Sequence, residues 1–483
     1  MLENENIFLK NCNLTLKLFK CEFMYQKTYH IHFVGIGGIG MSGIAELLLN
    51  IGYQVSGSDD ASSDITENLK KLGGVVYKGH ATEQIQGADV VVISSAISSD
   101  NPEVVAARKE SIPVIPRAEM LAELMRLKYS VAIAGAHGKT TTTSIVSSVL
   151  DKGGLDPTVV IGGRLKSIGS NAVLGKGDFI VAEADESDGS FLKYSPTIAV
   201  ITNIDREHLD FYKDMDHIKS VFLAFIDRIP FYGLAILCLD NEPIQDLIPE
   251  IKKRFTTYGM STQADYQARN VVFQGMKSLF SIDYRGRCLG DILLNLPGLH
   301  NVYNATASVA VGLELGIPFE KIRAALETLQ GVQRRLEIKG EAGGITVVDD
   351  YGHHPTEIRS TLEALKECWP GRRKVIAFQP HRYSRTLALF DDFTRAFYQS
   401  DVLVVLPIYP AGEKKIEGVS AMALCERIRS RGHKNVIYLE NVLTAPTHLR
   451  SILRPGDVLL TLGAGDVWKV GEGVLKQMLD ATI

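Results

Sequence analysis

Short apolar runs alternate with longer amphipathic stretches along most of this chain. Runs such as Val90-Val91-Val92-Ile93 and Ile198-Ala199-Val200-Ile201 are as long as buried strands. The stretches between them carry apolar residues at helical spacing. Strands that alternate with helices are typical of a parallel sheet covered on both faces. The pattern therefore predicts an α/β protein with doubly wound sheets.

The predicted strands fall into three groups, and 483 residues are too many for one ordinary core. We predict three domains: a Rossmann-like N-terminal domain over 29–126, a central P-loop ATPase-type α/β domain over 127–332 and a C-terminal Rossmann-like α/β domain over 333–483. Residues 1–28 mix leucines with lysines and lack the continuous apolar segment of a signal peptide. They predict a poorly ordered extension, or a true start at Met24.

Composition narrows the classes of partner. The chain is 45% hydrophobic and 22% charged, with a net charge of −4, which describes an ordinary globular protein without the field that attracts nucleic acid. No apolar run reaches the ~18 residues that span a bilayer. The six cysteines are scattered, as in proteins with reduced thiols. We therefore expect a cytoplasmic protein with no nucleic-acid or membrane partner.

The most informative motif follows the strand-like segment Ser130–Ala134. It reads Gly135-Ala136-His137-Gly138-Lys139-Thr140-Thr141 and opens a helical pattern. Glycines let successive amides point into one concavity, the helix adds its positive end, and Lys139 adds a full charge. Thr140 stands where a magnesium ligand is needed. Although the loop is shorter than the common form, the motif predicts use of ATP or GTP; a chance Gly-Lys-Thr is the less favoured alternative.

A second glycine motif follows the first predicted strand. Gly35, Gly37 and Gly40, with Gly38 between them, fit G-x-G-x-x-G, and Asp59 follows at the spacing of a ribose contact. Such a loop places a diphosphate on a helix N-terminus. Alone it fits NAD, a UDP-sugar or a purely structural turn. Ser94 ends a third strand of the same segment.

Acidic and histidine residues follow two strands of the central segment. Glu183 ends one strand and begins the run Glu183-Ala184-Asp185-Glu186. A carboxylate there can hold magnesium beside nucleotide phosphates. We assign the metal to Glu183 because it leaves the strand first, and leave the other acids open. His208 follows the next strand; it is a second candidate ligand, although imidazole is an unusual partner for magnesium.

The third segment carries two polar clusters at neighbouring strand ends, 349–356 and 379–386. Arg382 and Arg385 can fork around a carboxylate. Ahead of a helix in the central segment, Asn301 and Asn304 could read an adenine edge, or Asn301 could cap the helix. Arg335 lies at the second domain boundary, as a phosphate contact or a charged linker.

Together these motifs resemble the Mur ligases of peptidoglycan synthesis, from about Tyr29 onward. The resemblance lies in residues 32–41, 135–141 and 183–191 and in the two C-terminal clusters. It implies a first domain for UDP-N-acetylmuramate, a central ATPase domain, a C-terminal domain for the amino acid, and domain closure on the substrates. It also implies ATP and Mg²⁺ as the nucleotide and the metal.

The resemblance further implies roles for individual residues. Lys139, Glu183 and His208 would be catalytic, and Thr140, Glu183 and His208 would bind metal. The sugar nucleotide would meet Gly35, Gly37, Gly38, Gly40, Asp59 and Ser94. ATP would meet residues 135–141 together with His300, Asn301, Asn304, Arg335 and Asp350. L-Alanine would meet Tyr351, His353, His381, Arg382 and Arg385.

The implied reaction activates a carboxylate as an acyl phosphate, which an amine then attacks to form an amide. His353 is a candidate base for the amine. We expect a monomer or a weak homodimer. The nearest alternative is a ligase that joins a recovered tripeptide to the same sugar nucleotide. An NAD-dependent dehydrogenase leaves the Lys139 loop unexplained, and a nucleotide-gated interaction protein leaves the His/Arg clusters unexplained.

Overall fold

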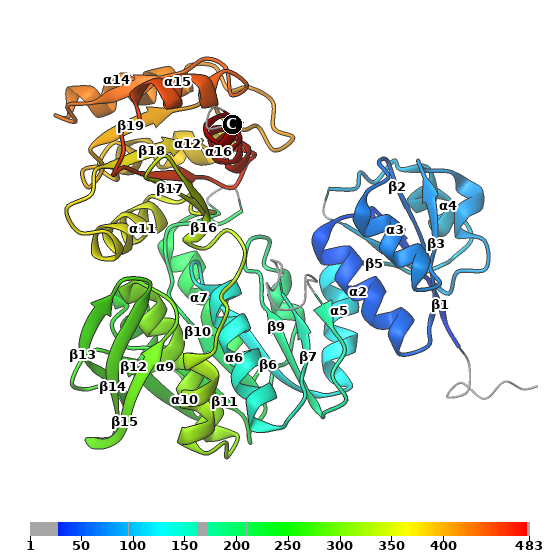
Figure 1. Cartoon of the computed structure of the whole chain (residues 1–483). Helices are drawn as coiled ribbons and strands as arrows, with labels where there is room; N and C mark the ends of the chain where they lie inside the picture. Colours follow the sequence, from blue (N-terminus) through cyan, green and yellow to red (C-terminus); the bar gives the residue numbers. More distant parts are fainter. Residues whose placement is uncertain (1–27, 95, 162–171, 209–210, 481–483) are drawn as a thin grey trace, which may run out of the picture. The chain divides into compact units, whose positions relative to one another are not determined.

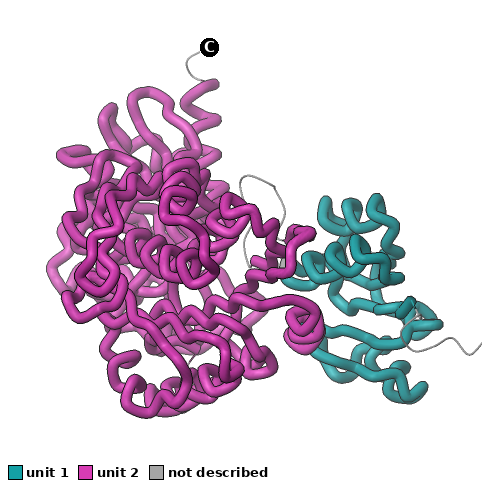
Figure 2. The backbone as a smooth tube through the Cα atoms, turned by 90° about the horizontal axis from the view of Figure 1, so that it is seen from below, with its two compact units in different colours: residues 1–117 teal, residues 118–483 magenta. Residues whose placement is uncertain are grey.

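The computed structural model describes residues 28–94, 96–161, 172–208 and 211–480. Apart from residue 28, the predicted extension over 1–28 lies outside these residues. The chain divides into two compact units, residues 1–117 and 118–483 (Figure 2). The central and C-terminal segments share the second unit, each with its own sheet. The limits given above for three domains stay predictions.

The first unit holds a five-stranded parallel sheet in the order β3-β2-β1-β4-β5 (Figure 1). This is the predicted Rossmann-like arrangement, with the strand order reversing beside β1, where ligands of such sheets bind. The edge strand β3 was not predicted because its short sequence is largely exposed. The strands are β1 (His30–Val34), β2 (Gln54–Asp59), β3 (Val75–Lys78), β4 (Val90–Ile93) and β5 (Val114–Pro116). The helices are α2 (Ile39–Asn50), α3 (Asp64–Lys71), η2 (Thr82–Ile85) and α4 (Pro102–Lys109).

The central sheet has ten strands in the order β15-β14-β13-β12-β11-β10-β6-β9-β7-β8. Its middle strands are parallel, whereas β13, β14 and β15 form antiparallel hairpins that the sequence analysis did not predict. The strands are β6 (Tyr129–Ala134), β7 (Thr158–Val160), β8 (Ala172–Val173), β9 (Phe179–Glu183), β10 (Ile198–Ile201), β11 (Leu234–Cys238), β12 (Phe255–Gly259), β13 (Tyr266–Gln274), β14 (Lys277–Tyr284) and β15 (Arg287–Leu294).

Helices α6 and α9 carry the predicted nucleotide residues and pack against each other beside this sheet (Figure 1). Both have nearly continuous buried faces of small and branched side chains, which permits the close approach. The helices of the central segment are α5 (Arg117–Arg126), which begins at the unit boundary, α6 (Lys139–Gly153), η3 (Ser190–Lys193), α7 (Met215–Asp227), α8 (Glu242–Leu247), η4 (Ile248–Glu250), α9 (Leu299–Glu314) and α10 (Phe319–Glu327).

The C-terminal sheet has the order β16-β17-β21-β18-β19-β20, with only β16 antiparallel. An apolar core lies on each face, as expected for a doubly wound sheet. The strands are β16 (Glu337–Ala342), β17 (Ile345–Asp350), β18 (Lys374–Phe378), β19 (Val402–Val405), β20 (Val436–Tyr438) and β21 (Val458–Leu462). The helices are α11 (Pro355–Cys368), α12 (Tyr383–Ala388), α13 (Phe390–Phe393), α14 (Ala421–Ser430), α15 (Ala445–Ile452) and α16 (Trp468–Asp480).

Among the helices within the described ranges, none is long and apolar enough to cross a membrane.

Candidate active site

The predicted phosphate loop joins β6 to α6 and is braced by the end of β10. The amide of His137 donates to Asn203 Oδ1 at 2.8 Å, and Asn203 Nδ2 donates back to the carbonyl of His137 at 3.0 Å. Gly138 caps α6 with φ +83°, and a Cβ there would stand 2.7 Å from Asn304 Oδ1. Only glycine combines this backbone with so close a neighbour. The loop therefore has the strand–turn–helix context that its sequence predicts.

Lys139 is held inside the loop by an ion pair with Glu186. Its Nζ donates to both carboxylate oxygens of Glu186 at 2.9 Å and to the carbonyl of Gly135 at 2.7 Å. Burial raises the pKa of Glu186 to about 7, although the positive charge of Lys139 opposes the shift. The lysine itself stays charged, because the carboxylate outweighs its burial and raises its pKa. A ligand phosphate would have to replace Glu186 on Lys139.

Three potential metal ligands gather beside this pair. Ligand atoms of Asp185, Glu186 and His208 all lie within 4.8 Å of one another. Glu183, the residue assigned from sequence, ends β9 opposite Ile133 of β6 and is outside this group. Sequence alone does not single out Asp185 or Glu186 as ligands; the turn after β9 brings them to the loop. His208, which was predicted as a second ligand beside Glu183, is grouped with Asp185 and Glu186, and its backbone has φ +55°.

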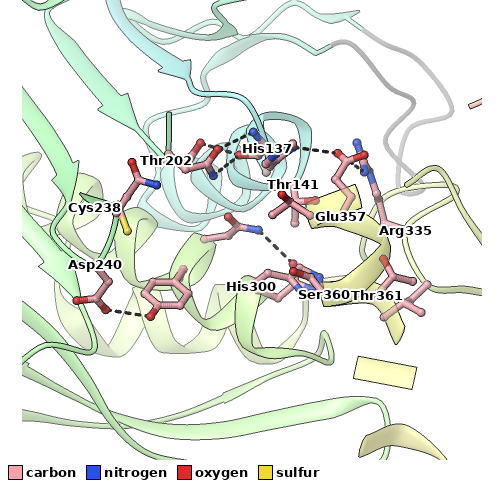
Figure 3. Close-up of a pocket in the computed structure, with 18 of the residues that line it drawn as sticks. His137, Thr141, Thr202, Cys238, Asp240, His300, Arg335, Glu357, Ser360 and Thr361 are labelled. Carbon is pink, nitrogen blue, oxygen red and sulfur yellow. Dashed lines mark hydrogen bonds and ion pairs between the residues drawn. The ribbon is translucent and has the colours of Figure 1, made fainter. Parts of the chain in front are cut away.

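A deep pocket lies between the central and C-terminal segments, with about 1050 Å³ of space that is partly open to solvent. It extends from His137 of the loop and Thr141 of α6 to Asp240 (Figure 3). Tyr303 also lines it. Of the predicted nucleotide residues, the pocket is lined by His137, Gly138, Thr141, His300, Asn301, Asn304, Arg335 and Asp350. The structure thus gathers residues that are far apart in the sequence into one cavity.

The lining residues differ in how they are held. Asn301 Nδ2 donates to the carbonyl of Pro297 at 2.7 Å, and Asn304 Nδ2 donates to Asn301 Oδ1 at 3.2 Å. Burial, with the nearby positive charge of Arg335, lowers the pKa of His300 to about 4, so this ring is neutral at pH 7. Asp350 accepts the amides of Leu336 and Gly352 at 2.8 Å. Its carboxyl therefore shapes the segment that carries Arg335.

Sequence reasoning missed several lining residues. Tyr258 is fully buried and its hydroxyl has no hydrogen-bond partner in the described structure. Tyr303 donates to Asp240 Oδ2 at 2.9 Å. Tyr258 belongs to no motif, and Tyr303 stands between the predicted residues Asn301 and Asn304 but was given no role. Only the three-dimensional arrangement identifies both tyrosines as lining residues.

Polar contacts join the central and C-terminal segments beside the phosphate loop. Thr356 Oγ1 donates to Asp205 Oδ2 at 2.8 Å, and the same oxygen contacts His137 Nε2 at 2.9 Å. Glu357 reaches from α11 toward both His137 and Arg335 (Figure 3). Burial disfavours a charged His137, but the carboxylates of Asp205 and Glu357 prevail and raise its pKa to about 10. The protonated ring of His137 thus helps to join the central and C-terminal segments.

The predicted amino-acid residues form a second cluster across the same boundary. Arg385 Nη2 donates to Glu207 Oε1 at 3.1 Å, and Arg385 Nη1 lies 3.4 Å from His381 Nδ1. The ring centroids of His353 and His381 are 5.7 Å apart, and those of Tyr351 and His353 are 5.4 Å apart. Tyr351 also lies under the guanidinium of Arg335. Glu207 is the member of this cluster that no motif had identified.

A pocket of about 780 Å³ opens beside this cluster. Its cations come from Arg206, Arg382 and Arg385, and Leu387, Leu389 and Ile416 supply an apolar wall. Burial lowers the pKa of His353 to about 4. The candidate base His353 is therefore neutral at pH 7 and free to accept a proton. Because its pKa is low, however, it is a weak base.

The glycine loop of the first unit is held by the end of β2. The carbonyl of Ser58 accepts the amides of Gly35 and Ile36 at 2.9 and 3.0 Å, and Asp59 Oδ2 accepts the amide of Gly37 at 2.9 Å. A Cβ on Gly37 would meet that carboxylate at 2.8 Å, and one on Gly40 would meet Arg117 at 3.0 Å. Ser94 follows β4 beside Gly35, and Gly38 precedes α2. The predicted sugar-nucleotide residues thus lie together.

Sequence profiles of known families match most of the chain. They are described as Mur ligase family, catalytic domain (residues 30–129), Mur ligase middle domain (133–312) and Mur ligase, glutamate ligase domain (334–465).

Two similar proteins cover nearly the whole chain. A UDP-N-acetylmuramate–L-alanine ligase of Desulfatibacillum aliphaticivorans is 68% identical over 452 residues, which are 94% of this chain and 99% of that protein. The crystal structure of the UDP-N-acetylmuramate–alanine ligase of Thermotoga maritima is 30% identical, covers 94% of this chain and 99% of that one, and has a TM-score of 0.78.

One tripeptide-type ligase structure matches a smaller part of this chain. The UDP-N-acetylmuramate:L-alanyl-γ-D-glutamyl-meso-diaminopimelate ligase of Neisseria meningitidis is 28% identical, with a TM-score of 0.59. It covers 64% of this chain and 100% of that structure.

Proposed function

This chain belongs to the Mur ligase family, and we infer that it uses ATP to join L-alanine to the carboxylate of UDP-N-acetylmuramate. The products are ADP, phosphate and UDP-N-acetylmuramoyl-L-alanine, a precursor of peptidoglycan. The observation that carries this inference is the 68% identity, over 99% of its length, to a ligase with that activity in its name. We place the reaction in the cytoplasm, where ATP is made.

The phosphoryl-transfer half of the reaction belongs to the loop residues. An amine cannot displace oxide from a carboxylate, so the carboxylate first attacks the γ-phosphoryl group of ATP and ADP leaves. Lys139 would release Glu186 and contact the phosphates, where its charge stabilises the transferring group. The N-terminus of α6, with the amides of residues 135–141, would bind the remaining phosphate oxygens. Asn304, Asn301 and His300 would contact the nucleoside, and Arg335 and Asp350 would complete its site.

The donor set beside Lys139 fits a magnesium ion. Two carboxylates and an imidazole converge within 4.8 Å, and oxygen donors suit this hard cation. We propose that Glu183, His208 and Thr140 hold it together with Asp185 or Glu186. When bound, Mg²⁺ would neutralise phosphate charge.

The amide-forming half belongs to the second cluster. We propose that Arg382 and Arg385 hold the carboxylate of L-alanine, with Tyr351, His353 and His381 around it. Arg385 is already oriented by Glu207. The apolar wall of the neighbouring pocket suits a small aliphatic side chain. The neutral amine then attacks the acyl phosphate, the C–N bond forms and phosphate leaves.

The experiment measures ADP and phosphate release with UDP-N-acetylmuramate, Mg²⁺ and single amino acids. Turnover with L-alanine, and none without the sugar nucleotide, is the expected result. Turnover with L-Ala-γ-D-Glu-meso-diaminopimelate but not with L-alanine would instead establish the tripeptide ligase. Mass spectrometry of the product distinguishes amide formation from idle hydrolysis of ATP.

A further inference from the structure

A buried polar cluster in the first unit has no part in the function described so far. It comprises His32, Ser56, Ser58, His80 and Glu103, here called the Glu103 cluster. Glu103, near the start of α4, His32 and Ser58 are fully buried. Burying a carboxylate costs free energy unless several donors surround it. A fully buried Glu103 is therefore expected to have a specific structural role.

Glu103 is held as a charged group by the side chains around it. Ser58 Oγ donates to its Oε2 at 2.6 Å, His80 Nδ1 lies 2.8 Å from the same oxygen, and His32 Nε2 lies 3.2 Å from Oε1. Burial raises the pKa of this carboxyl, but the hydrogen bonds prevail and lower it below its ordinary value. Charge-assisted hydrogen bonds are the strongest that side chains make. Glu103 therefore fixes Ser58 firmly.

Ser58 is the residue through which the cluster reaches the glycine loop. While its side chain binds Glu103, its carbonyl accepts the amides of Gly35 and Ile36. The next residue, Asp59, accepts the amide of Gly37. Three successive amides of the loop are therefore positioned by Ser58 and Asp59, the last two residues of β2. Glu103 in turn holds Ser58 through its side chain.

We propose that Glu103 is a positioning residue for the sugar nucleotide. It makes no contact with the ligand; acting through Ser58, it keeps the glycine loop in the shape that binds the diphosphate. The proposal rests on the proposed function for the identity of that ligand. It does not depend on turnover, because UDP alone carries the diphosphate and probes the same loop.

Two buried serines on β2 make a matched pair for the test. Ser56 and Ser58 point to the same face of the sheet and are 3% and 0% exposed. Ser56 Oγ lies 2.7 Å from both His30 Nε2 and His32 Nδ1, so Ser56→Ala also removes buried hydrogen bonds, two residues before Ser58. Both variants should therefore lose thermal stability, and Ser58→Ala should affect the loop more, because only Ser58 contacts Glu103 directly.

The full-length chain is used for binding and for kinetics. Ser58→Ala removes the hydrogen bond to the Glu103 carboxylate and the 2.9 Å contact between Ser58 Oγ and His80 Nδ1. The loss should raise the Kd of UDP, measured by calorimetry, about tenfold. The KM of UDP-N-acetylmuramate should rise by the same factor, with kcat and the KM of ATP unchanged. Ser56 reaches Glu103 only through His32, so Ser56→Ala should raise the Kd of UDP and the KM of UDP-N-acetylmuramate much less and should leave kcat and the KM of ATP unchanged. An unchanged Kd in Ser58→Ala, or an equal rise in Ser56→Ala, would overturn the proposal.

Substitutions of Glu103 itself give a second, independent readout. Glu103→Gln keeps the shape and one acceptor oxygen, whereas Glu103→Ala removes both oxygens. The rise in the Kd of UDP should therefore be smaller for glutamine than for alanine, and absent in the exposed control Glu110→Gln. If Ser58→Ala does not fold, Glu103→Gln decides, and an unchanged Kd there refutes the role. Unaltered UDP binding combined with no turnover in the wild type would count against the proposed function instead.

Discussion

The two glycines that bracket α6 allow the phosphate loop to be tested against a matched control. Gly138 and Gly154 both have left-handed backbones, with φ +83° and +89°. An alanine in that conformation costs about 1–2 kcal/mol at either position. At Gly154 a Cβ meets nothing within 4 Å, whereas at Gly138 it stands 2.7 Å from Asn304 Oδ1. Asn304 is buried and bonded to Asn301, so it cannot move freely.

The two variants should therefore differ in their affinity for ATP, and not only in their stability. In Gly138→Ala the free loop should relax away from Asn304, and ATP must restore the strained shape. Restoring about 2 kcal/mol corresponds to a rise of about thirtyfold in the KM of ATP. In Gly154→Ala the strain is present with and without ATP, so the KM should stay the same while thermal stability falls.

The assay couples ADP release to a spectrophotometric signal at saturating L-alanine and UDP-N-acetylmuramate. Circular dichroism melts report the stability of both variants. If the two variants raise the KM of ATP equally, or if neither does, the close contact between Gly138 and Asn304 does not set the shape of the loop.

Four further outcomes are expected. Lys139→Ala should abolish turnover while UDP still binds; loss of UDP binding would contradict separate sites. Because the folded-state pKa of His137 is raised from 6.5 to about 10, its charge stabilises the fold fully below pH 6.5 and less as the pH rises toward 10. The difference in melting temperature between wild type and His137→Asn should therefore shrink over that range, and a constant difference would refute the assignment. Arg385→Lys, which loses the planar fork that meets Glu207, should raise the KM of L-alanine about tenfold and leave that of ATP unchanged; the reverse would place Arg385 in the nucleotide site. Chelation by EDTA should stop ADP release and added Mg²⁺ should restore it, whereas turnover that survives chelation would exclude a magnesium requirement.

Local chemistry explains which features could be predicted from sequence. The Gly35 and Gly138 loops were identifiable because the turn, the close approach and the helix start all depend on residues adjacent in the chain. Several strands of the parallel sheets, among them β6, β10 and β18, were likewise visible as apolar runs. The parallel strands β7, β11, β12 and β20 were not predicted. The hairpins β13–β15 were not predicted, although alternating burial in β13 is clear in the structure, because no motif drew attention to that segment.

The rest of the site depends on contacts between distant residues. The rule that ligands follow a strand end selected Glu183, but only the turn after β9 brings Glu186 back to Lys139. Glu207 and Arg385 are separated by 178 residues, so no spacing in the sequence relates them. The weak basicity of His353 likewise comes from burial, which a single sequence does not reveal.

The ion pair between Lys139 and Glu186 also sets how the ligands of the loop influence one another. While Glu186 neutralises the lysine, an incoming phosphate must compete with it. If a divalent cation draws the same carboxylate away, the lysine becomes available to the nucleotide. Coupling between two binding equilibria is reciprocal, so bound nucleotide would raise the affinity for the metal by the same factor as bound metal raises the affinity for the nucleotide. The ion pair would thus couple the binding of metal to the binding of nucleotide. Either ligand alone would bind more weakly than the two together.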